Sequence, residues 1–172
     1  ETIKRKIYKS SQVITKGRSD NKIIVFGEDE EVLPYKLANC CNPIPGDRIF
    51  GFTTVEDGIK IHKDDCPNSI QLLSNYAYRI LDSSWVDREK IDFIAIINVK
   101  GIDRLGLINN VTKIISSQMN VNMRSININS DDGVFEGEIT LFVHNVTVLN
   151  TLTEKLKNVD GVTKIKRIYK HT

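Results

Sequence analysis

The side chains best suited to hold a metal ion are the three cysteines of this sequence and one of its histidines. Cys40 and Cys41 are adjacent in the segment ANCCNPIPGD, and His62 and Cys66 follow in the segment IHKDDCPN. Three thiolates and an imidazole form a donor set that structural zinc favours, because four such ligands close a tetrahedral site. Neighbouring side chains of an extended strand point to opposite faces, so the two adjacent thiols can share one ion only where the backbone bends.

Three other interpretations of these cysteines remain open. Cysteines are small and apolar enough to fill a hydrophobic core, and the residue types support this about as well as they support zinc. A disulfide between Cys40 and Cys41 would close a strained ring. A catalytic thiol would need a base, for which His62 is the nearby candidate, but no third activating group or oxyanion motif accompanies it in the sequence.

The composition is that of a globular protein with a real core. The 172 residues are 40% hydrophobic and 27% charged, with a formal net charge of +2. No apolar run approaches the roughly 20 residues that a membrane-spanning helix needs. An odd number of cysteines without an apolar leader argues against a disulfide framework and indicates a reducing cytoplasm. Because the sequence starts at Glu1, we interpret it as part of a longer protein, and we interpret its basic ends as solvated faces.

The cysteine segments belong to a first small unit, which we place at residues 22–81 after a connector from an upstream domain at 1–21. Two strand-like runs, DRIFGFTTV and GIKIHK, are joined by an Asp-Gly step that indicates a hairpin. The prolines of the cysteine segment exclude a helix there. A helix is predicted to start at Asn68, with an apolar face formed by Ile70, Leu73, Ala77, Ile80 and Leu81.

A linker at residues 82–92 separates this unit from a second one at 93–170. There the strand-like runs and helical periods follow one another in the order βαββαβ, which is the split βαβ, ferredoxin-like plan. Right-handed crossovers place both helices of such a plan on one face of a four-stranded antiparallel sheet. The predicted fold class is therefore α+β, with a small cysteine-rich α/β module followed by a ferredoxin-like domain.

A second segment of chemical interest is DRLGLI, which starts at Asp103 and joins the first strand of the second unit to its helix. Gly106 lets a neighbouring backbone or a ligand come close, and the start of a helix offers unpaired N–H groups to a carboxylate. The same residues fit a tight turn that needs glycine only for packing. From the residues alone, packing is the better supported of these two interpretations.

The two cysteine segments closely resemble the cysteine-rich module in the C-terminal half of the long RelA/SpoT proteins, the bifunctional (p)ppGpp synthetase/hydrolases. The matching pattern is CCNPIPGDRIFGF followed by IHKDDCPN, and in that family an ACT domain of βαββαβ order comes next. The resemblance covers roughly residues 20–170. It implies a zinc site, for which it gives as ligands Cys40, Cys41, His62 and Cys66.

The DRLGLI turn is similar to a turn that lines an amino-acid site in many ACT domains, with Ile108 in place of a leucine. By this resemblance, an effector such as a branched-chain amino acid would contact Asp103, Arg104, Gly106 and Leu107. We also expect such a domain to form a homodimer, because an exposed sheet edge such as the last strand can pair with its copy.

The sequence carries neither the metal-dependent HD hydrolase signature nor a Gly-rich phosphate loop, so we predict a non-catalytic chain. The resemblance implies the regulatory region of a stringent-response GTP pyrophosphokinase, which contacts ribosomal RNA and tRNA on the ribosome and signals to upstream catalytic domains. The residues expected to pair with RNA phosphates are Arg48, Lys60 and Lys63. Two alternatives are an amino-acid sensor built on paired ACT domains and a purely structural dimerisation module.

Overall fold

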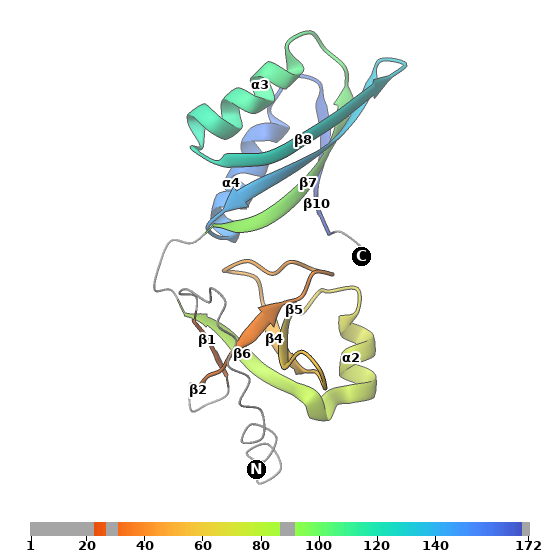
Figure 1. Cartoon of the computed structure of the whole chain (residues 1–172). Coiled ribbons are helices and arrows are strands. Elements are labelled where there is room, and N and C mark those ends of the chain that lie inside the picture. The colour runs from red at the N-terminus through yellow and green to blue at the C-terminus, as the bar shows by residue number, and fades with distance from the viewer. Residues whose placement is uncertain (1–22, 27–30, 87–91, 170–172) are drawn as a thin grey trace.

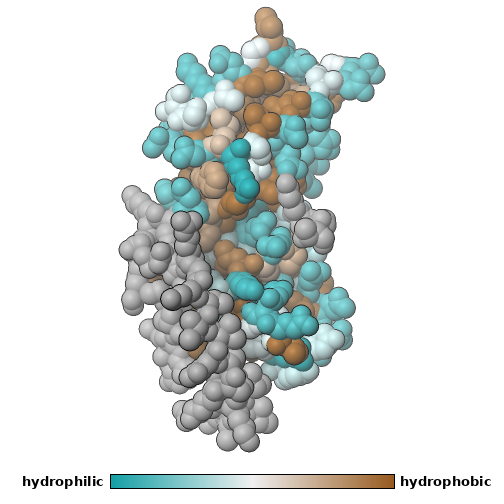
Figure 2. Space-filling model, viewed as in Figure 1, coloured by the Kyte–Doolittle hydropathy of each residue, from teal (hydrophilic) through white to brown (hydrophobic). Residues whose placement is uncertain are grey.

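The computed structural model describes residues 23–26, 31–86 and 92–169, which form two units with one β-sheet each. Figure 1 shows the first unit below and the second unit, with its sheet and two helices, above it. Within these ranges no helix is both long and apolar enough to cross a membrane. On the visible face, hydrophobic residues form small patches among hydrophilic ones in both units (Figure 2). The predicted connector at 1–21 lies outside the described residues.

The first unit contains a six-stranded sheet with the strand order β2-β1-β6-β4-β5-β3. Its strands are β1 (Ile23–Phe26), β2 (Glu31–Val32), β3 (Tyr35–Leu37), β4 (Ile49–Thr53), β5 (Ile59–Lys63) and β6 (Ile80–Val86). The predicted hairpin is confirmed, because β4 and β5 are antiparallel partners over their whole length. Since β3 pairs with β5 in parallel, the loop from β3 to β4 passes the carboxyl end of β5. We call residues 38–47 of that connection the cysteine loop.

The helix of the first unit is shorter than predicted. α2 (Ser69–Tyr76) is followed by the 3-10 turn η1 (Ala77–Arg79), and the chain then enters β6. The prediction of one apolar helix face that continues to Leu81 is wrong, because Ile80 and Leu81 pair with β4 in the sheet. Ile70, at the start of the predicted face, is 77% exposed. Residues 82–86, which were predicted to belong to the linker, lie in β6.

The second unit has the predicted βαββαβ order. Its elements are β7 (Phe93–Ile102), α3 (Leu107–Lys113) with the π-helical turn η2 (Ile114–Gln118), β8 (Asn122–Asp131), β9 (Val134–Val143), α4 (Val146–Lys157) and β10 (Val162–Ile168). The sheet order is β10-β7-β9-β8, and all neighbouring strands are antiparallel. Both helices contribute to one core on one face of this sheet, and the predicted α+β class is confirmed (Figure 1).

The core of the second unit lies between its helices and its sheet. Every second residue of β7 from Ala95 to Val99 is buried there. α4 packs against this face with three leucines that recur at helical spacing, Leu149, Leu152 and Leu156. The same core contains Ile44, which is fully buried although it comes from the cysteine loop of the first unit. The two units are therefore in direct contact through that loop.

Candidate metal centre

The cysteine loop turns sharply at its two adjacent cysteines. The amides of Cys41 and Asn42 both donate to the carbonyl oxygen of Ala38, at 3.4 and 2.9 Å, and Asn42 has a left-handed φ of 39°. This turn supplies the bend that adjacent thiols need in order to face one ion. Because the loop passes the carboxyl end of β5, it brings the thiols against His62 in that strand and Cys66 in the turn that follows.

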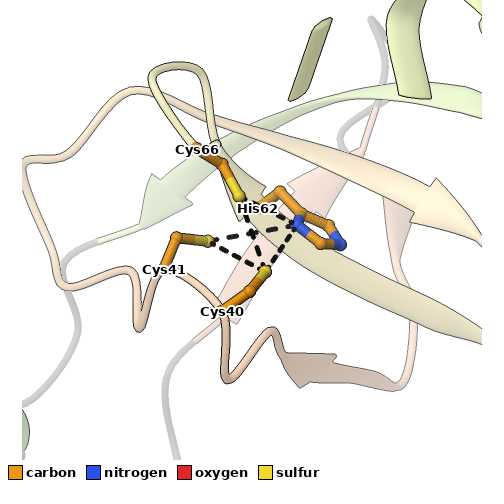
Figure 3. A group of neighbouring side chains, drawn as sticks. All are labelled: Cys40, Cys41, His62 and Cys66. Atoms are coloured by element: carbon orange, nitrogen blue, oxygen red, sulfur yellow. Dashed lines mark hydrogen bonds between the residues drawn. The ribbon is translucent and has the colours of Figure 1, made fainter. Parts of the chain in front are cut away.

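The four predicted ligands converge on one point (Figure 3). Nδ1 of His62 lies 3.5, 4.0 and 3.7 Å from the sulfur atoms of Cys40, Cys41 and Cys66, respectively. The sulfur atom of Cys40 lies 4.0 Å from that of Cys41 and 3.5 Å from that of Cys66, and all four donor atoms lie within 4.8 Å of one another. Tetrahedral zinc, with bonds of about 2.3 Å to sulfur and about 2.0 Å to nitrogen, requires donor separations of about 3.5–3.8 Å. Three of these five separations lie in that range, and the two that involve Cys41 exceed it by about 0.2 Å, so the donor set fits zinc with a small movement of Cys41.

Burial controls the protonation of these ligands when no metal is bound. The side chains of Cys41 and Cys66 are 0% and 2% exposed, and this loss of solvent raises the pKa of both thiols. Burial lowers the pKa of His62, and the charge of Lys60 lowers it further, so the imidazole is neutral near pH 7. Neutral imidazole is the metal-binding form, and a divalent cation would supply the positive charge that buried thiolates need.

Two further contacts orient the ligands. The ring of His62 stacks on Phe50 of the paired strand, with 5.6 Å between the ring centroids and 17° between the ring planes. The backbone amide of Lys63 donates to the sulfur atom of Cys41 at 3.4 Å. An amide directed at this sulfur stabilises the thiolate more than the thiol, which favours the form that binds metal.

The geometry argues against the other interpretations of the cysteines. All three are free, and the 4.0 Å between the sulfur atoms of Cys40 and Cys41 far exceeds the about 2.05 Å of a disulfide bond. Burial also argues against a catalytic role for Cys41 and Cys66, because a catalytic thiol needs a lowered pKa and burial raises the pKa of these two thiols. Core packing explains why cysteines are buried, but it does not explain an imidazole nitrogen directed at three sulfur atoms. These four side chains could therefore hold a metal ion.

The predicted effector residues lie in the turn between β7 and α3. Gly106 has a φ of 81° and directly precedes α3. On the surface, Asp103 accepts a hydrogen bond from Ser130 at 2.6 Å, and Arg104 pairs with Asp160 at 3.3 Å. Leu107 is 3% exposed and packs in the core. Residues 103–109 together line a surface hollow of about 370 Å³.

The three basic residues predicted to meet RNA differ in their exposure. The side chains of Arg48 and Lys60 are 88% and 37% exposed, and each pairs with an aspartate of the first unit. The side chain of Lys63 is only 8% exposed. Its Nζ lies 2.6 Å from the hydroxyl of Tyr169 in the second unit and 3.7 Å from a carboxylate oxygen of Asp47. Lys63 is thus engaged at the contact between the units.

Asp47, Arg167 and Tyr169 also lie at this contact, although they were not predicted as functional residues. In the sequence, Asp47 is one letter of the cysteine pattern and Arg167 is one of several basic residues expected to be solvated. The side chains of these two residues are 8% and 15% exposed, and they form an ion pair at 2.9 Å. Strand periodicity could have indicated that Arg167 is not solvated, because Arg167 lies two residues from the core-packing Ile165 and therefore on the same face of β10.

Two known domain families match adjoining parts of the chain. Residues 23–86 match the RelA/SpoT RIS domain, and residues 89–167 match the ACT domain. The boundary between the two matches falls between β6 and β7, where the first sheet ends and the second begins. Both domains are regulatory, and neither is a catalytic domain.

Two curated relatives and one solved domain structure are similar to this chain. The GTP pyrophosphokinase of Streptomyces coelicolor is 32% identical over 154 residues, which are 89% of this chain and 18% of the relative. The bifunctional (p)ppGpp synthase/hydrolase RelA of Mycobacterium tuberculosis is 34% identical over 134 residues, 77% of this chain and 18% of the relative. The crystal structure of the ACT domain from the GTP pyrophosphokinase of Chlorobium tepidum shares 39% identity, with a TM-score of 0.42 over 45% of this chain and 99% of that one.

The chain thus spans about a fifth of the length of the curated relatives it matches, between 18% and 23%. The part it spans consists of the two adjoining domain matches, which account for almost all of the described residues. The chain therefore belongs to the RelA/SpoT family, in which it corresponds to the regulatory RIS and ACT domains.

Proposed function

We propose that this chain is the regulatory region of a stringent-response enzyme that makes or hydrolyses (p)ppGpp, and that zinc holds its RIS domain together. Catalytic domains elsewhere in the parent protein would carry out the chemistry, and the RIS and ACT domains would report to them that uncharged tRNA occupies the ribosome. The observation that carries the metal part is the convergence of Cys40, Cys41, His62 and Cys66. The family matches and the names of the relatives support the regulatory part.

Metal analysis of the freshly reduced protein tests the zinc site. We expect about one zinc ion per chain, because four ligands close one tetrahedral site. Cobalt(II) in its place should give the visible absorption of a tetrahedral thiolate complex. Cys66→Ser should lose the ion, whereas the exposed control Ser74→Ala on α2 should keep it. Reduced wild-type protein that takes up no zinc from a micromolar solution would contradict this part of the proposal.

The partner that we propose is the ribosome. This partner is in keeping with a cytoplasmic protein whose thiols stay reduced. The exposed side chains of Arg48 and Lys60 are available to RNA phosphates, whereas that of Lys63 is nearly buried. Because such contacts release counterions, cosedimentation with ribosomes that carry uncharged tRNA should decrease steeply as salt rises. The double variant Arg48→Glu and Lys60→Glu should cosediment less than wild type, while the exposed ACT control Lys164→Glu should not differ. Equal binding by all three proteins would remove Arg48 and Lys60 from the interface.

An amino-acid sensor is the second candidate, and the hollow lined by residues 103–109 favours it. β8 and β10 form the two edges of the ACT sheet, where a second copy could pair to give a homodimer. Isothermal titration with leucine, valine and isoleucine tests this function. We expect binding heat that Asp103→Ala abolishes, and the absence of heat at millimolar amino acid would exclude the sensor.

A further inference from the structure

The cysteine loop carries two of the four candidate ligands and also forms the surface on which the ACT domain sits. Ile44 of this loop is fully buried in the ACT core. The amide of Val146, at the start of α4, donates to the carbonyl oxygen of Pro45 at 2.9 Å. Gly46 has a φ of 95°, and a Cβ at this position would lie 3.3 Å from the Cβ of Val146, so glycine permits this close approach. One short loop thus contacts the metal site and the ACT domain.

The end of the loop is held by Asp47, whose side chain is 8% exposed. One carboxylate oxygen accepts a hydrogen bond from the amide of Ile44 at 2.8 Å. The other lies 2.9 Å from Nη1 of Arg167 in β10 and 3.7 Å from Nζ of Lys63. A carboxylate this deeply buried requires compensating positive charge. Lys63 of the RIS domain supplies part of this charge, and Arg167 of the ACT domain supplies the nearer cation, so the conformation of the loop depends in part on the ACT domain.

Arg167 also contacts the loop next to a ligand. Its Nη2 donates to the carbonyl oxygen of Asn42 at 2.8 Å, and Asn42 is the left-handed residue that directly follows Cys41. One guanidinium group therefore joins both ends of the segment 42–47. Its fork of donors suits this task, since it can bind two acceptors in a fixed geometry.

The ACT domain holds β5 in a similar way. Tyr169, which follows β10, lies with its hydroxyl 2.6 Å from Nζ of Lys63, the residue next to His62. The backbone amide of the same Lys63 donates to the sulfur atom of Cys41. The contacts from Arg167 and Tyr169 thus reach residues adjacent to the ligands, without using any of the four donor atoms.

We propose that the ACT domain clamps the metal site, with Arg167 and Asp47 holding the cysteine loop in the conformation that presents Cys40 and Cys41 to zinc. This inference rests on the proposed zinc site and adds a regulation of it. Docking of the ACT domain increases zinc affinity, and because such coupling is reciprocal, zinc strengthens the docking of the ACT domain on the RIS domain. A change at either domain is thereby transmitted to the other.

Zinc affinity, measured on the full chain by competition with a chelator of known affinity, tests the clamp. Arg167→Met retains a long side chain but removes the charge and the donors. We expect its zinc dissociation constant to rise about 10-fold, because groups that orient metal ligands typically contribute at least this much to affinity. Lys166→Met is the matched control, because its side chain is exposed and on the opposite face of β10. Its zinc affinity should equal that of wild type.

A lysine variant keeps this test decisive. Arg167→Lys retains the charge beside Asp47 but loses the fork that also reaches Asn42, so its zinc affinity should lie between those of wild type and Arg167→Met. If Arg167→Met does not fold, Arg167→Lys decides. Wild-type affinity in the folded variants would overturn the clamp and leave the zinc site intact. A wild-type chain that binds no zinc would instead overturn the proposed site.

Hydrogen exchange of the full chain tests the reciprocal direction. The amide of Val146 is protected by its bond across the domain contact to Pro45. Zinc should slow its exchange several-fold in wild type and leave it unchanged in Cys66→Ser. The amide of Ile139, within the ACT sheet, is the internal control that should not respond. Exchange at Val146 that is the same with and without zinc in wild type would overturn the coupling.

Discussion

Gly101 in β7 lies in close contact with the backbone of Gly161, in the turn that precedes β10. The amide of the next residue, Ile102, donates to the carbonyl oxygen of Gly161 at 2.8 Å. A Cβ at Gly101 would collide with that oxygen and would lie 2.8 Å from a ring atom of Phe135. Phe135 is 1% exposed, so its ring has little space into which it can move. The register of β10 on β7 therefore depends on the absence of a side chain at this position.

Gly101→Ala should for this reason lower the free energy of unfolding by about 2 kcal/mol, the order of magnitude of an overpacked core. Urea unfolding at a fixed zinc concentration measures the loss. Lys164→Ala changes an exposed residue opposite Lys100 in the same strand pair, and its effect should stay below about 0.5 kcal/mol. Equal stability of Gly101→Ala and wild type would show that the two strands can separate here without cost.

Helices α2 and α4 show which part of the fold local periodicity can predict. In α4 the period places three leucines on one face, and the structure buries all three between helix and sheet. In α2 a similar period continues too far, because isoleucine and leucine fit a helix and a strand equally well in a short apolar run. Ile80 and Leu81 form a strand because they pair with Phe52 and Gly51 of β4. That contact is long-range, so no local pattern encodes it.

Alanine substitutions in these two helices should therefore have very different effects. Leu152 of α4 is 0% exposed, and Leu152→Ala should lower the free energy of unfolding by about 2–5 kcal/mol through the cavity it leaves. Ile70 of α2 is 77% exposed, and Ile70→Ala should change it by less than about 0.5 kcal/mol. Urea titrations of both variants measure the difference. A large loss for Ile70→Ala would mean that this side chain is packed rather than solvated.

The two domains are joined by residues that no motif or period connects. The four candidate ligands could be predicted from their types and spacing, and the ACT fold from the order of its elements. The ion pair between Asp47 and Arg167 links positions 120 residues apart in two different domains. The bend that lets the adjacent cysteines converge could not be predicted from the sequence either, since Asn42 tolerates a left-handed φ but does not require one. Convergence of the site and contact between the domains are therefore properties of the folded chain.

Asp47→Ala should separate the unfolding of the two domains. The substitution leaves the side chains of Arg167 and Lys63, 15% and 8% exposed, without the carboxylate between them, which should cost about 3 kcal/mol. In thermal scans of zinc-loaded protein we expect one transition for wild type and two for Asp47→Ala, with the RIS domain unfolding first. Asp57→Ala removes an exposed carboxylate that pairs with Lys60, so its single transition should stay at the wild-type temperature. If Asp47→Ala also gave one transition at that temperature, the packing of Ile44 in the ACT core would suffice to join the domains, and the charge would not.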